Sequence, residues 1–95
     1  MKIGIIGLGL IGGSFGISLR EMKLISSVSG YDLNKENEQI ALNLGLIDEI
    51  IDIEEMKKKC DVIFLAIPVE AIIKTLQILS DVKENVTIID LGSTK

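Results

Sequence analysis

Short apolar runs alternate along this chain with stretches in which apolar residues recur every three or four positions. A continuous apolar run of four to eight residues is typical of a buried strand, whereas the longer spacing is typical of an amphipathic helix. The runs that predict strands are residues 2–6, Val28–Tyr31, part of Leu46–Ile51, Val62–Ile67 and Val86–Ile89. The chain is therefore expected to alternate strands with helices.

Local signals place four helices between these strands. The first is expected over about Leu10–Met22, the second begins after an N-cap at Asn34 and ends before Gly45, and a brief third runs from an N-cap at Asp52 through Lys59. The fourth follows Pro68. The residues expected to face the core are Ile11, Phe15, Leu19 and Met22 in the first helix, Ile40, Ala41 and Leu44 in the second, and Val69, Ile72, Ile73, Leu76 and Leu79 in the fourth.

This alternation predicts an α/β fold of the Rossmann type, a doubly wound parallel sheet with right-handed crossovers. The run Val62–Ile67 is apolar throughout and stops at Pro68, as expected for a central strand covered on both faces. It should lie beside the first strand. We predict five strands in the order 3-2-1-4-5, and the fold is truncated after the fifth strand.

A GxGxxG fingerprint follows the first apolar run directly. Gly7 permits the tight turn out of the strand, Gly9 would let a dinucleotide pyrophosphate approach the main chain, and Gly12 lets the next helix pack on the strand. The main-chain N–H groups near Leu10 and Ile11 would point at the anion. The motif predicts a dinucleotide site, although glycines of this spacing also form ordinary turns.

Asp32 follows Gly12 by 20 residues, where the fingerprint places an acidic group for the ribose hydroxyls. Its carboxylate would repel a 2′-phosphate, so we expect NAD rather than NADP as cofactor. Lys35 works against that preference because it is a nearby cation. The alternative is a solvated aspartate that opens the turn Asp32-Leu33-Asn34.

Three loops should converge where the first and fourth strands diverge, because ligands bind there in such sheets. These loops are Gly7–Gly13, residues 66–69 and residues 91–94. The second would cover the cofactor with main chain and apolar side chains, or simply end its strand. The predicted cofactor contacts beyond the fingerprint are Asp32, Leu33, Ala66, Ile67, Pro68 and Val69.

Composition limits the remaining possibilities. Ninety-five residues, 47% of them hydrophobic, suffice for one compact domain. A net charge of −4 with interspersed signs excludes a basic patch for nucleic acid, and no apolar run reaches the roughly 20 residues of a membrane helix. The lone Cys60 is expected to be buried, and no metal site is predicted. We expect a cytoplasmic protein.

Four segments together make the chain resemble the prephenate dehydrogenase family. They are Gly7–Ser14, Gly30-Tyr31-Asp32, Ala66–Val69 and the stretch Asp90-Leu91-Gly92-Ser93-Thr94-Lys95. The resemblance spans the whole chain. It implies oxidative decarboxylation of prephenate to 4-hydroxyphenylpyruvate, or of arogenate in some members, during tyrosine biosynthesis, with NAD or NADP as hydride acceptor and a homodimeric enzyme. It also implies that Ser93 orients the substrate; alternatively, Ser93 satisfies its own loop.

The chain departs from the family in one respect, because it contains no histidine and stops before the family's catalytic histidine and helical dimerisation domain. We therefore expect residues 1–95 to form a single dinucleotide-binding domain without catalytic residues, which binds cofactor without turnover and self-associates through the fifth strand. Two other functions stay open: a stand-alone module for adenine dinucleotides, and a dehydrogenase for another small hydroxy acid.

Overall fold

A parallel sheet forms the centre of the molecule. The computed structural model describes residues 1–9, 18–19 and 21–91. Within them, strands in the order β3-β2-β1-β4-β5 make one five-stranded sheet, and every neighbouring pair is parallel. The strands are β1 (Lys2–Ile6), β2 (Ser27–Tyr31), β3 (Glu49–Ile50), β4 (Val62–Leu65) and β5 (Thr87–Asp90). The predicted strand order is confirmed.

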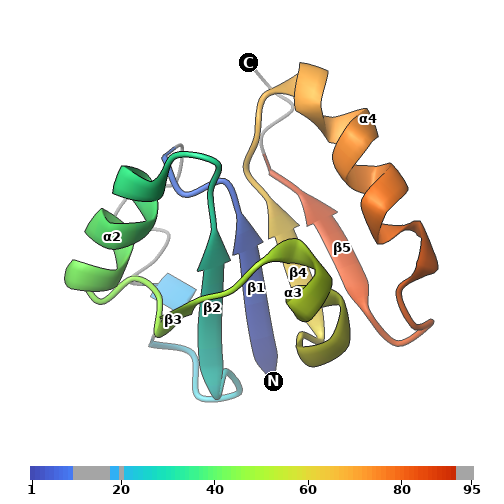
Figure 1. Cartoon of the computed structure of the whole chain (residues 1–95). Coiled ribbons are helices and arrows are strands. Elements are labelled where there is room, and N and C mark those ends of the chain that lie inside the picture. Colours follow the sequence, from blue (N-terminus) through green and yellow to red (C-terminus); the bar gives the residue numbers. More distant parts are fainter. Residues whose placement is uncertain (10–17, 20, 92–95) are drawn as a thin grey trace.

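The register brings the carboxyl ends of the inner strands to one edge. Ile6, the last residue of β1, pairs with Tyr31 on one side and with Leu65 on the other. Figure 1 shows these ends together at the top of the view, between α2 (Lys35–Asn43) and α4 (Val69–Ile78). β1 and β4 lie side by side, as predicted. The loops that leave this edge are therefore close neighbours in space.

The strands differ slightly from their predicted limits. β4 ends at Leu65 rather than at Ile67, because the chain already turns toward α4 over Ala66 and Ile67. β5 is shifted by one residue relative to Val86–Ile89. These shifts leave the predicted strand order unchanged.

Helix boundaries follow the predicted caps. The side chain of Asn34 accepts a hydrogen bond from the Glu36 N–H, and that of Asp52 accepts one from the Glu55 N–H at the start of α3 (Ile53–Lys59). Gly45, just past the end of α2, has a positive φ of 76°. A short 3₁₀ helix, η1 (Leu79–Asp81), follows α4.

Of the first predicted helix, residues 10–17 and 20 lie outside the described residues. Leu19 is buried, as predicted for the inward face, but Met22 is exposed, so its predicted place in the core is wrong.

Two apolar clusters lie on opposite faces of the sheet. Along β4, Ile63 and Leu65 join one cluster, whereas Val62 and Phe64 pack against the other. The first cluster includes residues of α3 and α4, among them Met56 and Ile72; the second includes Leu19 and, on α2, Ala41. The expectation of a central strand with apolar contacts on both faces is confirmed. Cys60 is buried in the first cluster, also as predicted.

The predicted inward face of α2 is wrong in part. Ala41 is buried, but Ile40 and Leu44 are exposed, and Glu38 is buried instead. Leu42 packs against the core from the same side as Ala41. The helix is rotated from the predicted orientation because Glu38 finds a hydrogen-bond partner beneath it. A charged residue at this position would ordinarily be assigned to the solvent face.

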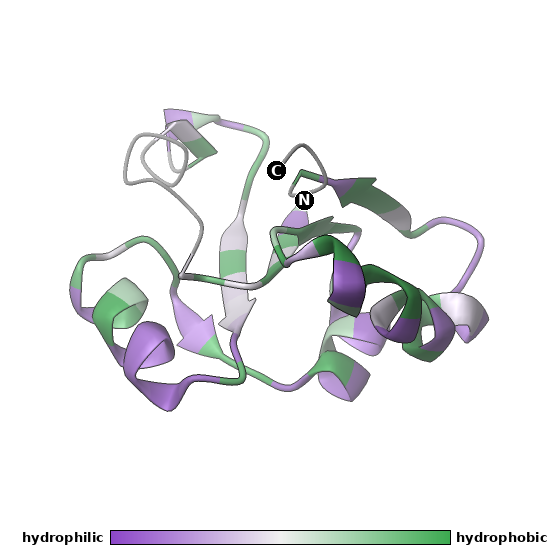
Figure 2. Cartoon of the chain, turned by 90° about the horizontal axis from the view of Figure 1, so that it is seen from above, coloured by the Kyte–Doolittle hydropathy of each residue, from purple (hydrophilic) through white to green (hydrophobic). Residues whose placement is uncertain are grey.

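The predicted face of α4 also needs correction. Ile72 and Leu79 are buried, but Val69, Ile73 and Leu76 are exposed. Thr75 takes the inward place expected of an apolar residue, and its hydroxyl donates to the carbonyl oxygen of Ala71, 2.9 Å away. Figure 2, which looks down on the molecule, shows hydrophobic residues along much of α4, so composition alone could not fix which side faces the sheet.

Candidate functional site

The turn after β1 is tightly fitted against the turn after β4. Gly7 has a φ of +96°, a conformation that favours glycine, and a Cβ atom there would overlap the carbonyl oxygen of Ala66. The Gly7 N–H donates to the carbonyl oxygen of Tyr31 at 2.8 Å, and the Ala66 N–H donates to that of Ile6 at 2.8 Å. The ends of β1, β2 and β4 are thus held together around a residue that has no side chain.

Asp32, immediately after β2, is anchored by the glycine-rich turn. Its Oδ2 accepts hydrogen bonds from the N–H groups of Leu8, at 2.7 Å, and Gly9, at 3.1 Å. Its Oδ1 accepts from the N–H of Asn34 at 2.8 Å. The side-chain amide of Asn37 is a further donor, 3.4 Å from Oδ2. These bonds fix the carboxylate beside the carboxyl ends of β1 and β2.

This environment keeps Asp32 ionised. Partial burial of the carboxyl would raise its pKa, but hydrogen bonds from the main chains of Asn34, Leu8 and Gly9 and from the Asn37 side chain outweigh burial and lower the pKa. Such bonds favour the charged form because a carboxylate accepts them more strongly than a neutral acid does. The site therefore presents a fixed negative charge beside the glycine-rich turn.

Glu38 is a member of the site that the sequence did not predict. Its side chain is buried, with only 3% of the residue exposed, and its Oε2 accepts a hydrogen bond from the Asp32 N–H at 3.0 Å. Its Oε1 lies 3.4 Å from the Lys35 ammonium, which also lies 5.8 Å from the centre of the Tyr31 ring. The sequence spacing between Asp32 and Glu38 did not indicate this contact, because the contact depends on how α2 packs against the end of β2.

Gly9 has a second structural reason to lack a side chain. A Cβ atom there would come within 2.6 Å of the Asn37 side-chain nitrogen. The glycine-rich turn therefore packs directly on the first turns of α2. A larger residue would have to displace Asn37, which itself donates to Asp32. The absence of a side chain at Gly9 therefore lets the turn lie close to both Asn37 and Asp32.

A cleft of about 630 Å³ opens along this edge of the sheet. Of the predicted cofactor residues, it brings together Gly7, Gly9, Asp32, Leu33, Ala66, Ile67 and Pro68. Val69 does not line it. Leu10, Ile11, Gly12 and Ser93 lie outside the described residues. The other residues that line the cleft are Ile6, Tyr31, Asn37, Ile53, Ala71, Lys74, Thr75 and Ile78.

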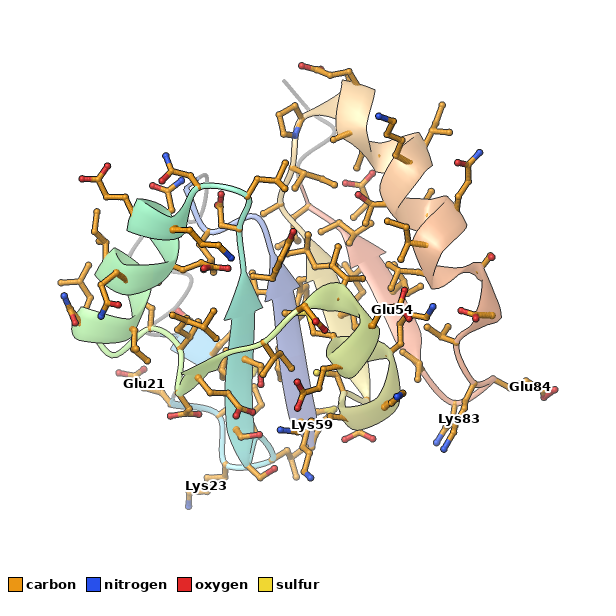
Figure 3. All side chains as sticks on the ribbon, in the orientation of Figure 1. Glu21, Lys23, Glu54, Lys59, Lys83 and Glu84 are labelled. Atoms are coloured by element: carbon orange, nitrogen blue, oxygen red, sulfur yellow. The ribbon has the colours of Figure 1, made fainter. Side chains whose placement is uncertain are left out.

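The sequence contained a signal for some of the missed residues. Ala71, Lys74, Thr75 and Ile78 are spaced three or four residues apart, so they share one face of α4. The sequence did not predict that this face lines the cleft, because the residues on the adjacent side of the helix were expected to pack on the sheet. Figure 3 shows that Lys23, Lys59, Lys83 and Glu84 lie toward the opposite end of the sheet.

The chemistry available in the cleft is that of binding. One wall presents the Asp32 carboxylate and main-chain groups, and the other is largely apolar, a combination that suits a ligand with polar hydroxyls and a flat apolar part.

Cys60 supplies no nucleophile, because burial raises the pKa of its thiol to about 11. Among the residues with described coordinates, no helix is long and apolar enough to cross a bilayer.

The parallel sheet, the glycine-rich turn and the acidic residue after β2 define a domain of the Rossmann type. Comparison with known proteins gives the family. The sequence matches the family described as prephenate dehydrogenase, nucleotide-binding domain, over residues 15–95. The chain belongs to this family, and the resemblance seen in its motifs is confirmed.

Individual relatives agree with this assignment. The chain is 35% identical to a prephenate dehydrogenase of Lactococcus lactis subsp. cremoris (strain MG1363) over 99% of its length, and 38% identical to one of Bacillus subtilis (strain 168) over 94%. It spans 27% and 25% of those proteins. It also superimposes, with a TM-score of 0.85 and 35% identity, on the crystal structure of prephenate dehydrogenase from A. aeolicus in complex with hydroxyphenyl propionate and NAD⁺, covering all of this chain and 34% of that one.

Proposed function

We propose that residues 1–95 bind NAD in the cleft, as the nucleotide-binding domain of a prephenate dehydrogenase. The observation that carries this proposal is the Asp32 carboxylate, held by the Leu8 and Gly9 N–H groups beside the cleft. In Rossmann domains an acidic residue at this place accepts the ribose hydroxyls. The relative from A. aeolicus, whose structure was determined with NAD⁺, supports the same cofactor.

Each part of the cofactor has a complementary part of the site. The pyrophosphate would lie over the glycine-rich turn that begins at Gly7 and Gly9, and the fingerprint assigns the N–H groups of residues 10–12 to it. The adenosine ribose would bind Asp32. The adenine would contact the apolar residues of the cleft, Leu33, Ala71 and Ile78 among them, and Ala66, Ile67 and Pro68 would cover the cofactor from the β4 side.

NAD is proposed over NADP because of the charge on Asp32. NADP carries a phosphate where NAD has the ribose 2′-hydroxyl, and a carboxylate that accepts a hydroxyl repels a phosphate. The hydrogen bonds that lower the pKa of Asp32 keep that charge in place at neutral pH. Of the described residues that line the cleft, Asp32 is the acidic one and Lys74, on α4, is the basic one.

In the whole protein we propose oxidative decarboxylation of prephenate to 4-hydroxyphenylpyruvate, in tyrosine biosynthesis in the cytoplasm. The cofactor, when bound, supplies the hydride acceptor. Ser93 would orient the substrate beside it. The hydroxyl proton of the substrate needs a base, for which histidine is the usual choice near neutral pH. The sequence contains no histidine, so we propose that the base comes from outside these 95 residues.

Calorimetric titration with NAD, NADP and ADP-ribose tests the proposal. We expect NAD to bind more tightly than NADP, and no NADH to form when prephenate is added to this chain alone. Binding of NAD and ADP-ribose with equal affinity would favour a stand-alone adenine-nucleotide module. Production of NADH from another small hydroxy acid would favour a different dehydrogenase. Folded protein that binds no dinucleotide would contradict the proposal.

We further propose that residues 1–95 act as one domain and that the chain self-associates through β5. In the described part of the chain, β5 pairs only with β4, and Ile89 and Leu91 are exposed beside it. An unpaired edge strand with apolar residues is a surface on which another chain can pair. Sedimentation velocity over a wide concentration range should detect the association, and a monomer at all concentrations would contradict it. The homodimer of the family is proposed for the whole protein on the resemblance alone.

A further inference from the structure

Glu38 is a buried carboxylate that cofactor binding, as proposed above, does not use. Burial of a charge is costly unless hydrogen bonds or an opposite charge compensate for it. Glu38 has one of each: the Asp32 N–H, 3.0 Å from Oε2, and the Lys35 ammonium, 3.4 Å from Oε1. Both partners belong to the segment that would meet the cofactor ribose. A residue buried at such cost beside that segment is a candidate for setting what the segment recognises.

The first contact positions Asp32. The Asp32 N–H lies at the end of β2, where the main chain leaves the sheet, so the bond to Glu38 fixes the point from which the Asp32 side chain extends. The carboxylate is then oriented by Leu8, Gly9 and Asn34. Glu38 thus supports the main chain of Asp32 and does not itself line the cleft.

The second contact of Glu38 is an ion pair with Lys35. Lys35 is the one basic residue between Asp32 and the end of α2, and its side chain is 80% exposed. A free ammonium here could bind the 2′-phosphate of NADP and offset the repulsion from Asp32. Instead it lies against Glu38 and over the ring of Tyr31, which lines the cleft. The charge of Lys35 is therefore already paired before any ligand arrives.

We propose that Glu38 is a specificity-determining residue, which favours NAD over NADP by holding the main chain of Asp32 and by pairing with Lys35. This inference rests on the proposed binding of dinucleotides in the cleft. It differs from the role of Asp32, which touches the ribose, because Glu38 acts only through its two neighbours. Removing its charge should therefore change the choice between the two cofactors more than it changes the affinity for NAD.

The substitution Glu38→Gln separates these effects. The glutamine amide oxygen can still accept from the Asp32 N–H, but Lys35 loses its ion pair and becomes available to a phosphate. We expect the ratio of the NADP to the NAD dissociation constant, measured by calorimetry on the protein, to fall roughly three- to tenfold. Glu36→Gln is the matched control, because it removes the same charge from an exposed position on the same helix, and it should leave the ratio within about twofold.

Two further variants identify the cause. Adding Lys35→Met to Glu38→Gln should restore most of the original ratio, since the released ammonium is then gone. Glu38→Asp keeps the charge but shortens the side chain, so it should weaken NAD binding while the preference for NAD persists. Thermal unfolding of each variant shows whether it is folded. Lys35→Met alone, at an exposed position, removes the ion pair but leaves the hydrogen bond from the Asp32 N–H to Glu38 in place.

The outcomes distinguish this inference from the proposed function. If the unmodified protein binds no dinucleotide, the proposed function fails. If it binds NAD with a clear preference and Glu38→Gln leaves that preference unchanged, or Glu36→Gln changes it equally, only the role of Glu38 is overturned. A loss of NADP binding in Lys35→Met alone would also overturn it, because Lys35 would then be reading the phosphate despite its pairing with Glu38.

Discussion

The two walls of the cleft are built from opposite kinds of contact. On the β2 side, α2 begins after its N-cap residue Asn34, and the start of the helix places Asn37 and Glu38 beside Asp32. On the β4 side, α4 begins after Pro68 with no side-chain cap, and the apolar residues Ala66, Ile67, Pro68, Ala71 and Ile78 line the cleft together with Lys74 and Thr75. The first wall can discriminate between ligands by charge and hydrogen bonding. The second supplies contact area and little selectivity.

This difference has a cause in how each helix is held. α2 has a polar residue at a buried position because a main-chain N–H lies beneath it, and that bond fixes its rotation. α4 rests on Ile72 and Leu79, while the apolar residues Val69 and Ile73 remain on its outer side. Directional bonds define one wall, whereas packing defines the other. The two walls should therefore respond differently to substitution.

The largest effect is expected where the two walls meet. Gly7→Ala would combine a strained positive φ with an overlap between Cβ and the main chain of Ala66, which has no freedom to withdraw. We expect a loss of roughly 3 kcal/mol or more in the free energy of unfolding, measured by urea denaturation, and loss of NAD binding.

Gly45→Ala is the control for this variant. Its φ is +76° but no atom lies within 4 Å of the added Cβ, so about 1 kcal/mol is expected. Equal losses would show that the contact with Ala66 is unimportant.

The packed wall should depend on which side of α4 is changed. Ile72→Ala removes a side chain that is 8% exposed, and we expect the free energy of unfolding to fall by roughly 2–4 kcal/mol. Ile73→Ala removes the same atoms from a residue that is 69% exposed, and a change within about 0.5 kcal/mol is expected. Urea denaturation of the pair measures the difference. If Ile73→Ala proved equally damaging, both residues would face the core, as predicted from the sequence.

Most of the fold could be predicted because the features that specify it are local. Apolar runs and glycines placed β1 and β4, and the residues Asn34, Asp52 and Gly45 marked helix ends through contacts within a few residues. The helix faces could not be predicted as well. In α4 six of ten residues are apolar or alanine, so several rotations would bury a similar surface, and contacts with β4 and β5 decide among them.

The candidate site shows the same limit. Gly7, Gly9 and Asp32 were recognisable because their spacing reflects one strand, one turn, the predicted crossover helix and the next strand. Glu38 and Asn37 were not, because their part in the site comes from α2 folding back on the turn after β1. Thr75 was missed because its hydroxyl is satisfied by its own helix, which lets a polar residue occupy an inward position.

The polar wall should govern cofactor affinity. Asp32→Asn keeps the shape of the side chain but removes its charge, so we expect NAD to bind roughly ten- to a hundredfold more weakly by calorimetry. Asp48→Asn is a matched control, because the Asp48 carboxylate also accepts a main-chain N–H of β2, from Val28 at 2.8 Å, but at the far end of the strand. It should leave NAD affinity unchanged. Equal weakening in both variants would point to a general loss of structure.

The smallest effect concerns the acid stability of the polar wall. The pKa of Asp32 is lowered in the folded protein, so folding is favoured by its charge at pH values above the pKa of an unfolded aspartate, about 3.9. As the pH falls through the lower, folded pKa, this stabilisation is lost. The difference in unfolding free energy between the protein and Asp32→Asn should therefore narrow between pH 5 and about pH 2. Urea denaturation at several pH values measures this difference.

The pKa values of Glu49 and Asp81 are also lowered, but both residues are present in each protein, so their contributions cancel in the difference. A gap that stayed constant or widened in acid would mean that the hydrogen bonds to Asp32 do not favour its charged form.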